Sequence, residues 1–97
     1  MITTKVVLCG SLEDVEKRMM LDYDILSKDY PQVSIVKAKH TIQIINYRIN
    51  KYISVRQLDK IDSYHPRYME ADVSAFLVAK PSQMKSAVEK YRKQLGD

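Results

Sequence analysis

The chain has 97 residues, of which 45% are apolar and 29% charged, and its formal net charge at pH 7 is +4. This length fits one domain with its own core, and no window reaches the roughly 18 consecutive apolar residues of a membrane-spanning helix. A single cysteine excludes an internal disulfide. Because the first apolar stretch is also too short for a secretory signal, the sequence predicts a cytoplasmic protein without membrane contact.

The first third of the chain predicts a strand followed by a helix. Residues 4–9 form a β-branched, apolar run that stops at a glycine. Ser11 is a suitable helix N-cap because Asp14 follows three residues later, where its carboxylate can complete a capping box. Apolar positions recur at helical spacing over residues 12–30, so we expect an amphipathic helix that ends before Pro31.

The middle of the chain predicts three strands. Short apolar and β-branched runs occupy residues 33–37, 41–45 and 48–55. The last two runs are separated by a short break at Asn46, a residue type that tolerates positive φ, and therefore predict a β-hairpin. The polar segment 56–70 predicts a loop with at most one helical turn.

The last third predicts one more strand and one more helix. Residues 72–79 are apolar at nearly every position, which is typical of a central strand covered on both faces. Residues 82–95 have apolar side chains at helical spacing, and Gly96 follows where a C-terminal cap belongs. The order β-α-β-β-β-β-α predicts a single α/β domain over residues 1–97, with one mixed sheet of about five strands and two amphipathic helices.

Positive charge is concentrated in residues 37–68. This segment holds seven Lys and Arg against two Asp, four of the seven tyrosines and both histidines. Cations neutralise phosphates and aromatic rings stack on bases, so the segment predicts a non-catalytic protein that binds nucleic acid. Period-two alternation places Arg48 and Tyr52 on one side of their strand, where we expect them to share an exposed surface. The predicted contact residues are Lys37, Lys39, Arg48, Lys51, Tyr52, Arg56, Tyr64, His65, Arg67 and Tyr68.

Other interpretations of the same segment stay open. Tyr and Arg are frequent hot spots of protein interfaces, so the basic surface also suits an acidic protein partner, as in an inhibitor or adaptor of a host protein. A solvated sheet edge, on which lysines prevent strand pairing, gives the same composition. Pairing of the middle strands between two copies of the chain would give a homo-oligomer.

The sequence predicts no enzyme, no cofactor and no metal site. Cys9 with His40 or His65 would be needed for an activated thiol, but Cys9 ends an apolar strand, where cysteine behaves as a small buried hydrophobe. The two histidines are 25 positions apart and lack the local spacing of zinc ligands. Glu70 and Asp72, next to a basic loop, are more typical of salt-bridge partners than of an acid–base pair.

The order of these elements resembles the core of a terminase-type P-loop ATPase. The resemblance rests on a strand that ends at Cys9-Gly10-Ser11, a hairpin with Asn46, and a strand that begins at Asp72 and ends at Ala79-Lys80-Pro81-Ser82. Residues 10–17 lack the second glycine and the Lys-Ser/Thr pair of the phosphate-binding loop, and Ala79-Lys80 stands in place of an acidic pair. The resemblance implies a degenerate phage protein that does not hydrolyse nucleotide.

Overall fold

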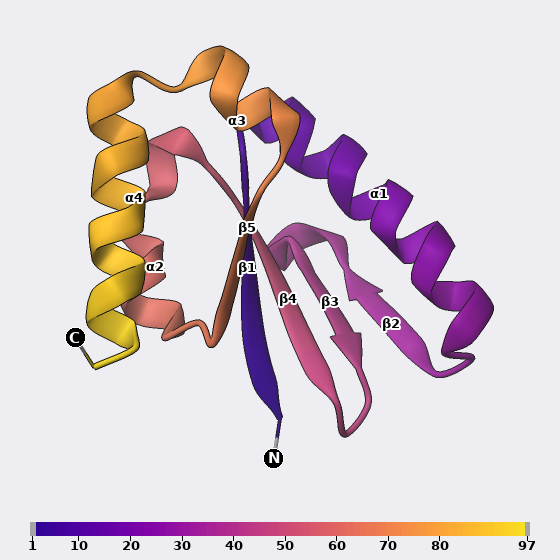
Figure 1. The fold of residues 1–97 in the computed structure, drawn as a ribbon. Helices are drawn as coiled ribbons and strands as arrows, with labels where there is room; N and C mark the ends of the chain where they lie inside the picture. Colours follow the sequence, from indigo (N-terminus) through magenta and orange to yellow (C-terminus); the bar gives the residue numbers. More distant parts are fainter. Residues whose placement is uncertain (1, 97) are drawn as a thin grey trace.

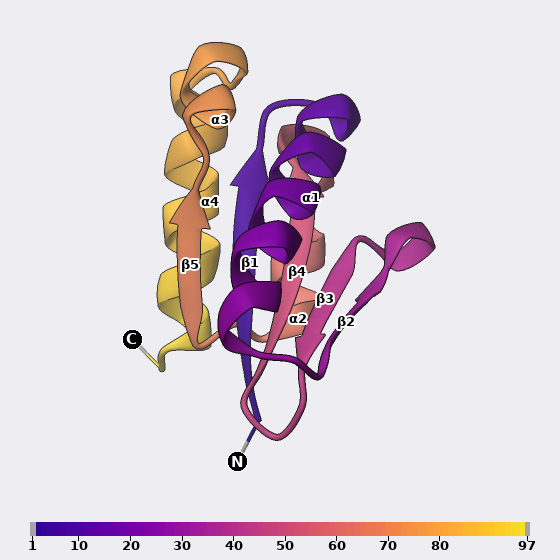
Figure 2. The same cartoon turned by 90° about the vertical axis from the view of Figure 1, so that its right-hand side faces the viewer.

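A mixed sheet of five strands forms the centre of the structure, a computed structural model that describes residues 2–96 (Figure 1). The strands are β1 (Thr3–Cys9), β2 (Val33–Val36), β3 (Thr41–Ile44), β4 (Arg48–Ser54) and β5 (Tyr68–Ala71). The helices are α1 (Leu12–Asp29), α2 (Lys60–Tyr64), α3 (Val73–Val78) and α4 (Pro81–Gln94), with short 3-10 turns η1 (Lys37–Lys39) and η2 (Val55–Gln57). Helix α1 covers one face of the sheet, and α2 and α4 cover the other, so the predicted α/β class is confirmed (Figures 1 and 2).

The sheet has the order β2-β3-β4-β1-β5. Strand β1 pairs in parallel with β4 and β5, whereas β2, β3 and β4 form an antiparallel meander. The predicted hairpin is therefore confirmed as β3–β4, and Asn46 in its turn has a φ of 61°. No helix within residues 2–96 combines the length and the apolar composition that a bilayer crossing requires.

Strand β1 connects two apolar cores because its side chains alternate between the faces of the sheet. Val7 is fully buried with Met19 of α1 in the core on one face. Leu8 is buried with Ile61 of α2 and Ala87 of α4 in the core on the other. Burial of each such aliphatic side chain stabilises the fold by about 2 kcal/mol, so both helical layers are held to the sheet chiefly by apolar packing.

The predicted central strand at residues 72–79 was wrong, because this segment forms helix α3. The Asp72 carboxylate accepts a hydrogen bond from the backbone N–H of Ser74 at 3.0 Å and so caps the first turn. Within the helix Ala75 is fully buried, whereas the side chains of Phe76 and Leu77 are 65% and 80% exposed. A short apolar run fits a buried strand and a short helix equally well, and here the aspartate cap favours the helix.

The predicted loop at residues 56–70 was also wrong in part. It contains α2 and the edge strand β5, which pairs with Lys5–Leu8 of β1. Helix α2 ends at Tyr64. The next residue, His65, caps it with a φ of 47°, in the left-handed region, and is followed by Pro66. The fifth strand of the predicted sheet therefore exists, but it lies before residue 72 and at the edge of the sheet.

Gly10, between β1 and α1, lies against helix α3. Its backbone N–H donates to the hydroxyl oxygen of Ser74 at 3.0 Å. A Cβ atom at this position would lie 2.6 Å from the carbonyl oxygen of Ser74 and 2.7 Å from a methyl group of Val78. Because a carbonyl oxygen of the backbone cannot move aside easily, only glycine fits between the first turn of α1 and α3.

We expect Gly10→Ala to lower the free energy of unfolding by about 2 kcal/mol, since the added methyl group forces α1 and α3 apart. Urea denaturation followed by circular dichroism measures this change. Gly96→Ala is the matched control: its φ of +84° strains alanine, but no atom lies within 4 Å of the added Cβ, so we expect a loss of at most about 1 kcal/mol. Equal stability of Gly10→Ala and the wild type would contradict this packing.

Candidate functional site

The predicted contact residues on β4 lie on opposite faces of the sheet. Arg48 and Tyr52 face α1, as the alternation predicts, while Lys51 faces α2. Tyr52 is only 2% exposed, because α1 covers this part of the sheet, so its prediction as a surface contact was wrong. Its hydroxyl donates to a carboxylate oxygen of Asp22 at 2.7 Å. Burial, reinforced by that carboxylate, raises the pKa of Tyr52 far above its usual value.

A group of lysines, which we name the lysine patch, lies on the face opposite α1. It comprises Lys39, Lys51 and Lys60. The Lys51 ammonium lies 5.2 Å from the ring centroid of Tyr64 and donates to the hydroxyl of Thr41 at 3.1 Å. Partial burial, followed by the positive charges of the two other lysines, lowers the pKa of Lys51. The patch is positively charged but presents one tyrosine ring, which lysine already covers.

The remaining predicted residues are exposed but dispersed. Lys37 lies in η1 between β2 and β3, and Arg56 lies in η2 after β4. His65 and Arg67 lie between α2 and β5. Nδ1 of His65 is 2.5 Å from the side-chain oxygen of Gln94. The residues predicted from the basic segment therefore do not form one continuous site.

The structure does bring Arg48 and Tyr68 together and adds two tyrosines to them. The guanidinium carbon of Arg48 lies 5.1 Å from the ring centroid of Tyr47 and 5.2 Å from that of Tyr68. Tyr47 in turn stacks on Tyr30, with centroids 5.8 Å apart and planes inclined by 20°. We name these four residues the Tyr–Arg row. The tyrosines are 37–47% exposed, so the row presents aromatic surface to solvent from the end of α1 to β5.

Arg18 pairs with three carboxylates on this face. Its guanidinium contacts Asp22 at 2.9 Å, Asp72 at 3.1 Å and also Glu70. Hydrogen bonds from Ser74, and then from Arg18, hold the pKa of Asp72 below its usual range. The side chain of Arg18 is only 18% exposed, so these pairs are partly desolvated and link α1 to the end of β5.

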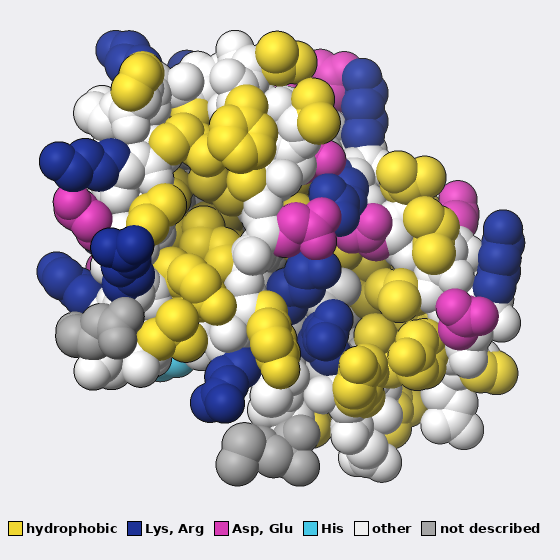
Figure 3. Space-filling view, in the orientation of Figure 1, with side chains coloured by type: hydrophobic (Ala, Val, Ile, Leu, Met, Phe, Trp, Pro, Cys, Tyr) yellow, Lys and Arg dark blue, Asp and Glu magenta, His cyan; other side chains and the backbone are white. Residues whose placement is uncertain are grey.

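Arg48 has no such partner. The Lys5 ammonium lies 2.6 Å from Glu70, and this contact, followed by that of Arg18, lowers the pKa of Glu70. No carboxylate within residues 2–96 lies within 4 Å of the Arg48 guanidinium. In the view of Figure 3, which looks onto the β5 edge of the sheet, basic and acidic side chains form a column through the middle, between apolar side chains on either side. The charge of Arg48 is therefore available to an anion from outside.

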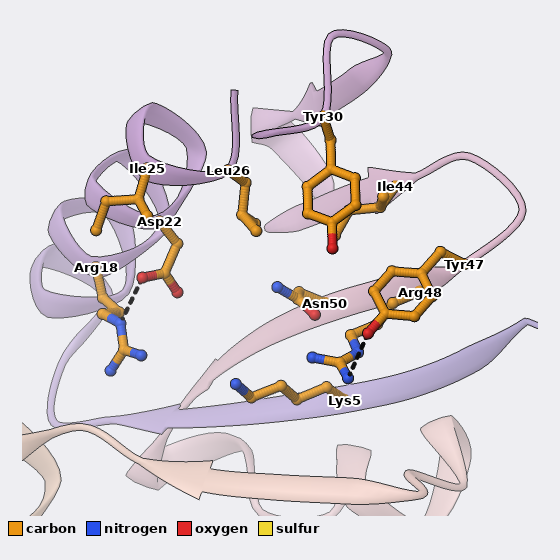
Figure 4. Close-up of a pocket in the computed structure, with 10 residues that line it drawn as sticks. All are labelled: Lys5, Arg18, Asp22, Ile25, Leu26, Tyr30, Ile44, Tyr47, Arg48 and Asn50. Atoms are coloured by element: carbon orange, nitrogen blue, oxygen red, sulfur yellow. Dashed lines mark hydrogen bonds and ion pairs between the residues drawn. The ribbon is translucent and has the colours of Figure 1, made fainter. Parts of the chain in front are cut away.

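An open pocket of about 200 Å³ lies behind the Tyr–Arg row, between α1 and the β3–β4 hairpin (Figure 4). Asn50 of β4 lies at its centre, and the hydroxyl of Tyr30 points into the same space. Asn50 is only 5% exposed. Its side-chain oxygen Oδ1 and the Nε of Arg48 are buried and have no hydrogen-bond partner among the described residues.

Several amides of the turn after β1 are bonded to side chains of the chain itself. The backbone N–H of Ser11 donates to the Asp14 carboxylate at 2.9 Å, and that of Asp14 donates to the Ser11 hydroxyl at 3.2 Å. This is the predicted capping box. Because Gly10 also donates to Ser74, three amides at this turn are bonded within the chain. Glu13 and Asp14 add negative charge to the first turn of α1, which disfavours a phosphate at this helix end.

Cys9 is fully buried beneath α1. Burial, together with the negative charge of Asp72, raises the pKa of its thiol to about 12. The thiol is therefore protonated at neutral pH and lacks the thiolate that nucleophilic chemistry needs. Within residues 2–96, no group of three or more His, Cys, Asp or Glu side chains is placed to hold a metal ion.

Tyr30, Tyr47, Lys5 and Asn50 belong to this site but were not among the contact residues predicted from the sequence. Tyr30 lies in the segment predicted as the first amphipathic helix, and its contact with Tyr47 depends on how α1 lies over the sheet. Lys5 lies in β1, whose apolar sequence has no local signal of a site. The alternation along β4, which places Asn50 on the same side as Arg48, is the signal that was available for it.

Comparison with known proteins gives no relative of this chain. No protein family, no curated protein and no solved structure matches it. The resemblance to terminase-type ATPases therefore stays a prediction, and the strand that it assigned to residues 72–79 is helix α3.

We expect Arg18→Met to lower the free energy of unfolding at pH 7 by about 2 kcal/mol, because it leaves three carboxylates without their cation but keeps the aliphatic stem. Lys17→Met is the matched control. It removes only the exposed pair with Glu13, whose atoms lie 3.2 Å apart, and we expect it to change stability by less than about 0.5 kcal/mol. Urea denaturation compares the two variants, and similar losses would contradict a structural role for Arg18.

The pH dependence provides a second readout of the same variant. The pKa values of Glu70 and Asp72 are lowered in the fold, so their carboxylates stabilise it above their unfolded pKa values of about 4. This stabilisation is lost as the pH falls below that value and through the folded-state pKa. We expect the wild type to lose more stability than Arg18→Met between about pH 5 and pH 3. An equal loss would show that Arg18 does not lower these pKa values.

Proposed function

We propose that the protein binds single-stranded nucleic acid along the Tyr–Arg row. The observation that carries this proposal is the row itself, in which exposed tyrosine rings flank an arginine that has no carboxylate partner among residues 2–96. Unpaired bases stack on aromatic rings, and a guanidinium binds phosphate through paired hydrogen bonds. The bases of a duplex are stacked on one another, so the row favours a single strand.

The charge distribution supports the same proposal. The net charge of +4 favours association with a polyanion. Arg67 is exposed and directly precedes β5, so it adds positive charge near this edge of the sheet. The lysine patch lies on the opposite face of the sheet and has no part in this interface. The proposed role is binding without catalysis, in the cytoplasm. The terminase resemblance suggests that the protein comes from a phage.

A protein partner is the second candidate, and helix α3 is the observation that favours it. Val73, Phe76 and Leu77 are 65–80% exposed on this short helix. Exposed apolar patches of this kind are typical of protein contacts. The Tyr–Arg row would then meet an acidic surface of the partner. Nucleic-acid binding tests separate the two candidates, because only the first requires affinity for oligonucleotides.

The test is fluorescence anisotropy of labelled single-stranded and duplex oligonucleotides at low and at physiological salt. We expect single strands to bind with a Kd of about 1 μM at low salt, and more weakly as salt rises. Arg48→Ala should weaken this binding by about tenfold, because it removes the cation and with it the side chain that contacts both tyrosine rings, Tyr47 and Tyr68.

Arg92→Ala is the matched control, since it removes the same charge from an exposed position on α4. We expect it to weaken binding by no more than about twofold. Equal effects of the two substitutions would mean that the row is not the interface. A failure of every oligonucleotide to bind at low salt would rule out the proposed function and leave the protein partner.

A further inference from the structure

The pocket behind the Tyr–Arg row contains polar groups that the fold leaves unsatisfied. Asn50 is more than nine-tenths buried, and its carboxamide nitrogen donates only to the hydroxyl of Tyr52, at 3.4 Å. The carboxamide oxygen accepts no hydrogen bond from the described residues. The buried Nε of Arg48 likewise donates no hydrogen bond to them. Buried polar groups normally have partners, so these two atoms indicate a ligand or water with both a donor and an acceptor.

The neighbours of Asn50 define which ligand fits. Ile25, Leu26 and Ile44 line the pocket with apolar surface, and Tyr30 and Tyr47 stand at its opening. The volume of about 200 Å³ is below the roughly 300–1,000 Å³ of sites for drug-sized molecules. The pocket therefore accommodates a single ring system, and not a whole nucleotide.

The charges at the back of the pocket favour an uncharged ligand. Arg18 is paired with carboxylates of three residues, and Lys5 is paired with Glu70. The Asp22 carboxylate accepts from both Arg18 and Tyr52, so it is also satisfied. Apart from Arg48, whose guanidinium belongs to the Tyr–Arg row, neither an unpaired cation for a free phosphate nor an unpaired anion for an amine lies beside Asn50 in the described part of the chain.

We infer that this pocket receives one unstacked base of the strand that lies along the Tyr–Arg row. A nucleobase has apolar faces for Leu26 and Ile44, and its edge carries a hydrogen-bond donor for Oδ1 of Asn50 beside an acceptor for Nε of Arg48. An asparagine carboxamide is suited to such an edge because it donates and accepts side by side. The inference rests on the proposed function. It adds that one base lies in the pocket and is hydrogen-bonded there, whereas the other bases stack on the tyrosine rings of the row.

The experiment replaces one base at a time in the shortest oligodeoxyadenylate that binds the wild-type protein with full affinity, since such a strand has a single register. An abasic site at the pocket position should weaken binding by about tenfold, against about twofold or threefold elsewhere. Replacing adenine by unsubstituted purine, which keeps the ring but lacks the amino donor, should weaken binding by about fivefold at that position only.

Asn50→Leu keeps the volume of the side chain and removes both hydrogen-bonding groups. We expect it to abolish the difference between the purine-substituted and unsubstituted strands. Gln43→Leu is the matched control, because Gln43 is an exposed amide on β3 and lies on the face opposite the pocket. It should keep the position-specific losses of the wild type. If Asn50→Leu fails to fold, the two substitution series on the wild-type protein still decide the question.

The outcomes separate this inference from the proposed function. One position with a large loss for both substitutions supports the base pocket. Similar losses at every position, with measurable binding throughout, would overturn the pocket and leave the binding surface intact, its polar atoms then being satisfied by water. The absence of binding by every oligonucleotide, oligodeoxyadenylates included, would overturn both.

Discussion

The ion pairs of Arg18 are the interaction on which the arrangement of the functional face depends. From the middle of α1, its guanidinium contacts Asp22 on the same helix and Glu70 and Asp72 at the end of β5. Asp72 also caps α3, so one partly desolvated cation joins α1, β5 and α3. These three carboxylates form their ion pairs with Arg18, and no carboxylate within residues 2–96 forms an ion pair with Arg48. The same pairs thus stabilise the fold and leave one arginine available to a ligand.

Local signals in the sequence predicted most of the elements, because their physical causes are local. The capping box at Ser11 and the positive φ of Asn46 both follow from the residues next to them. Residues 72–79 were misassigned because their apolar run fits both a strand and a helix. The Asp72 cap that favours the helix is local, whereas the contact of Gly10 with α3 joins distant segments and has no signal in the sequence. Edge strand β5 depends on its pairing with β1, which no feature of a polar loop sequence indicates.

The candidate site was predicted only in part, for a related reason. Charge counting selected residues 37–68, which include Tyr47, Arg48 and Tyr68 of the Tyr–Arg row, and the alternation along β4 correctly placed Arg48 and Tyr52 on one face. The alternation did not predict how exposed each of these side chains is. Helix α1 buries Tyr52, whereas Arg48 stays partly exposed. Tyr30 joined the site only through the fold, because the end of α1 stacks it on Tyr47. The distribution of cations over two faces likewise follows from a topology that one sequence does not specify.

Backbone amide chemical shifts recorded during titration with a short single-stranded oligonucleotide test the proposed interface most directly. Binding along the Tyr–Arg row predicts that the largest shifts occur at Tyr30, Tyr47, Arg48 and Tyr68, with smaller shifts along the exposed face of α4. Both regions carry exposed arginine or lysine, so a purely electrostatic association would not distinguish them. The largest shifts at the lysine patch or at α3, with none in the row, would contradict the proposed interface.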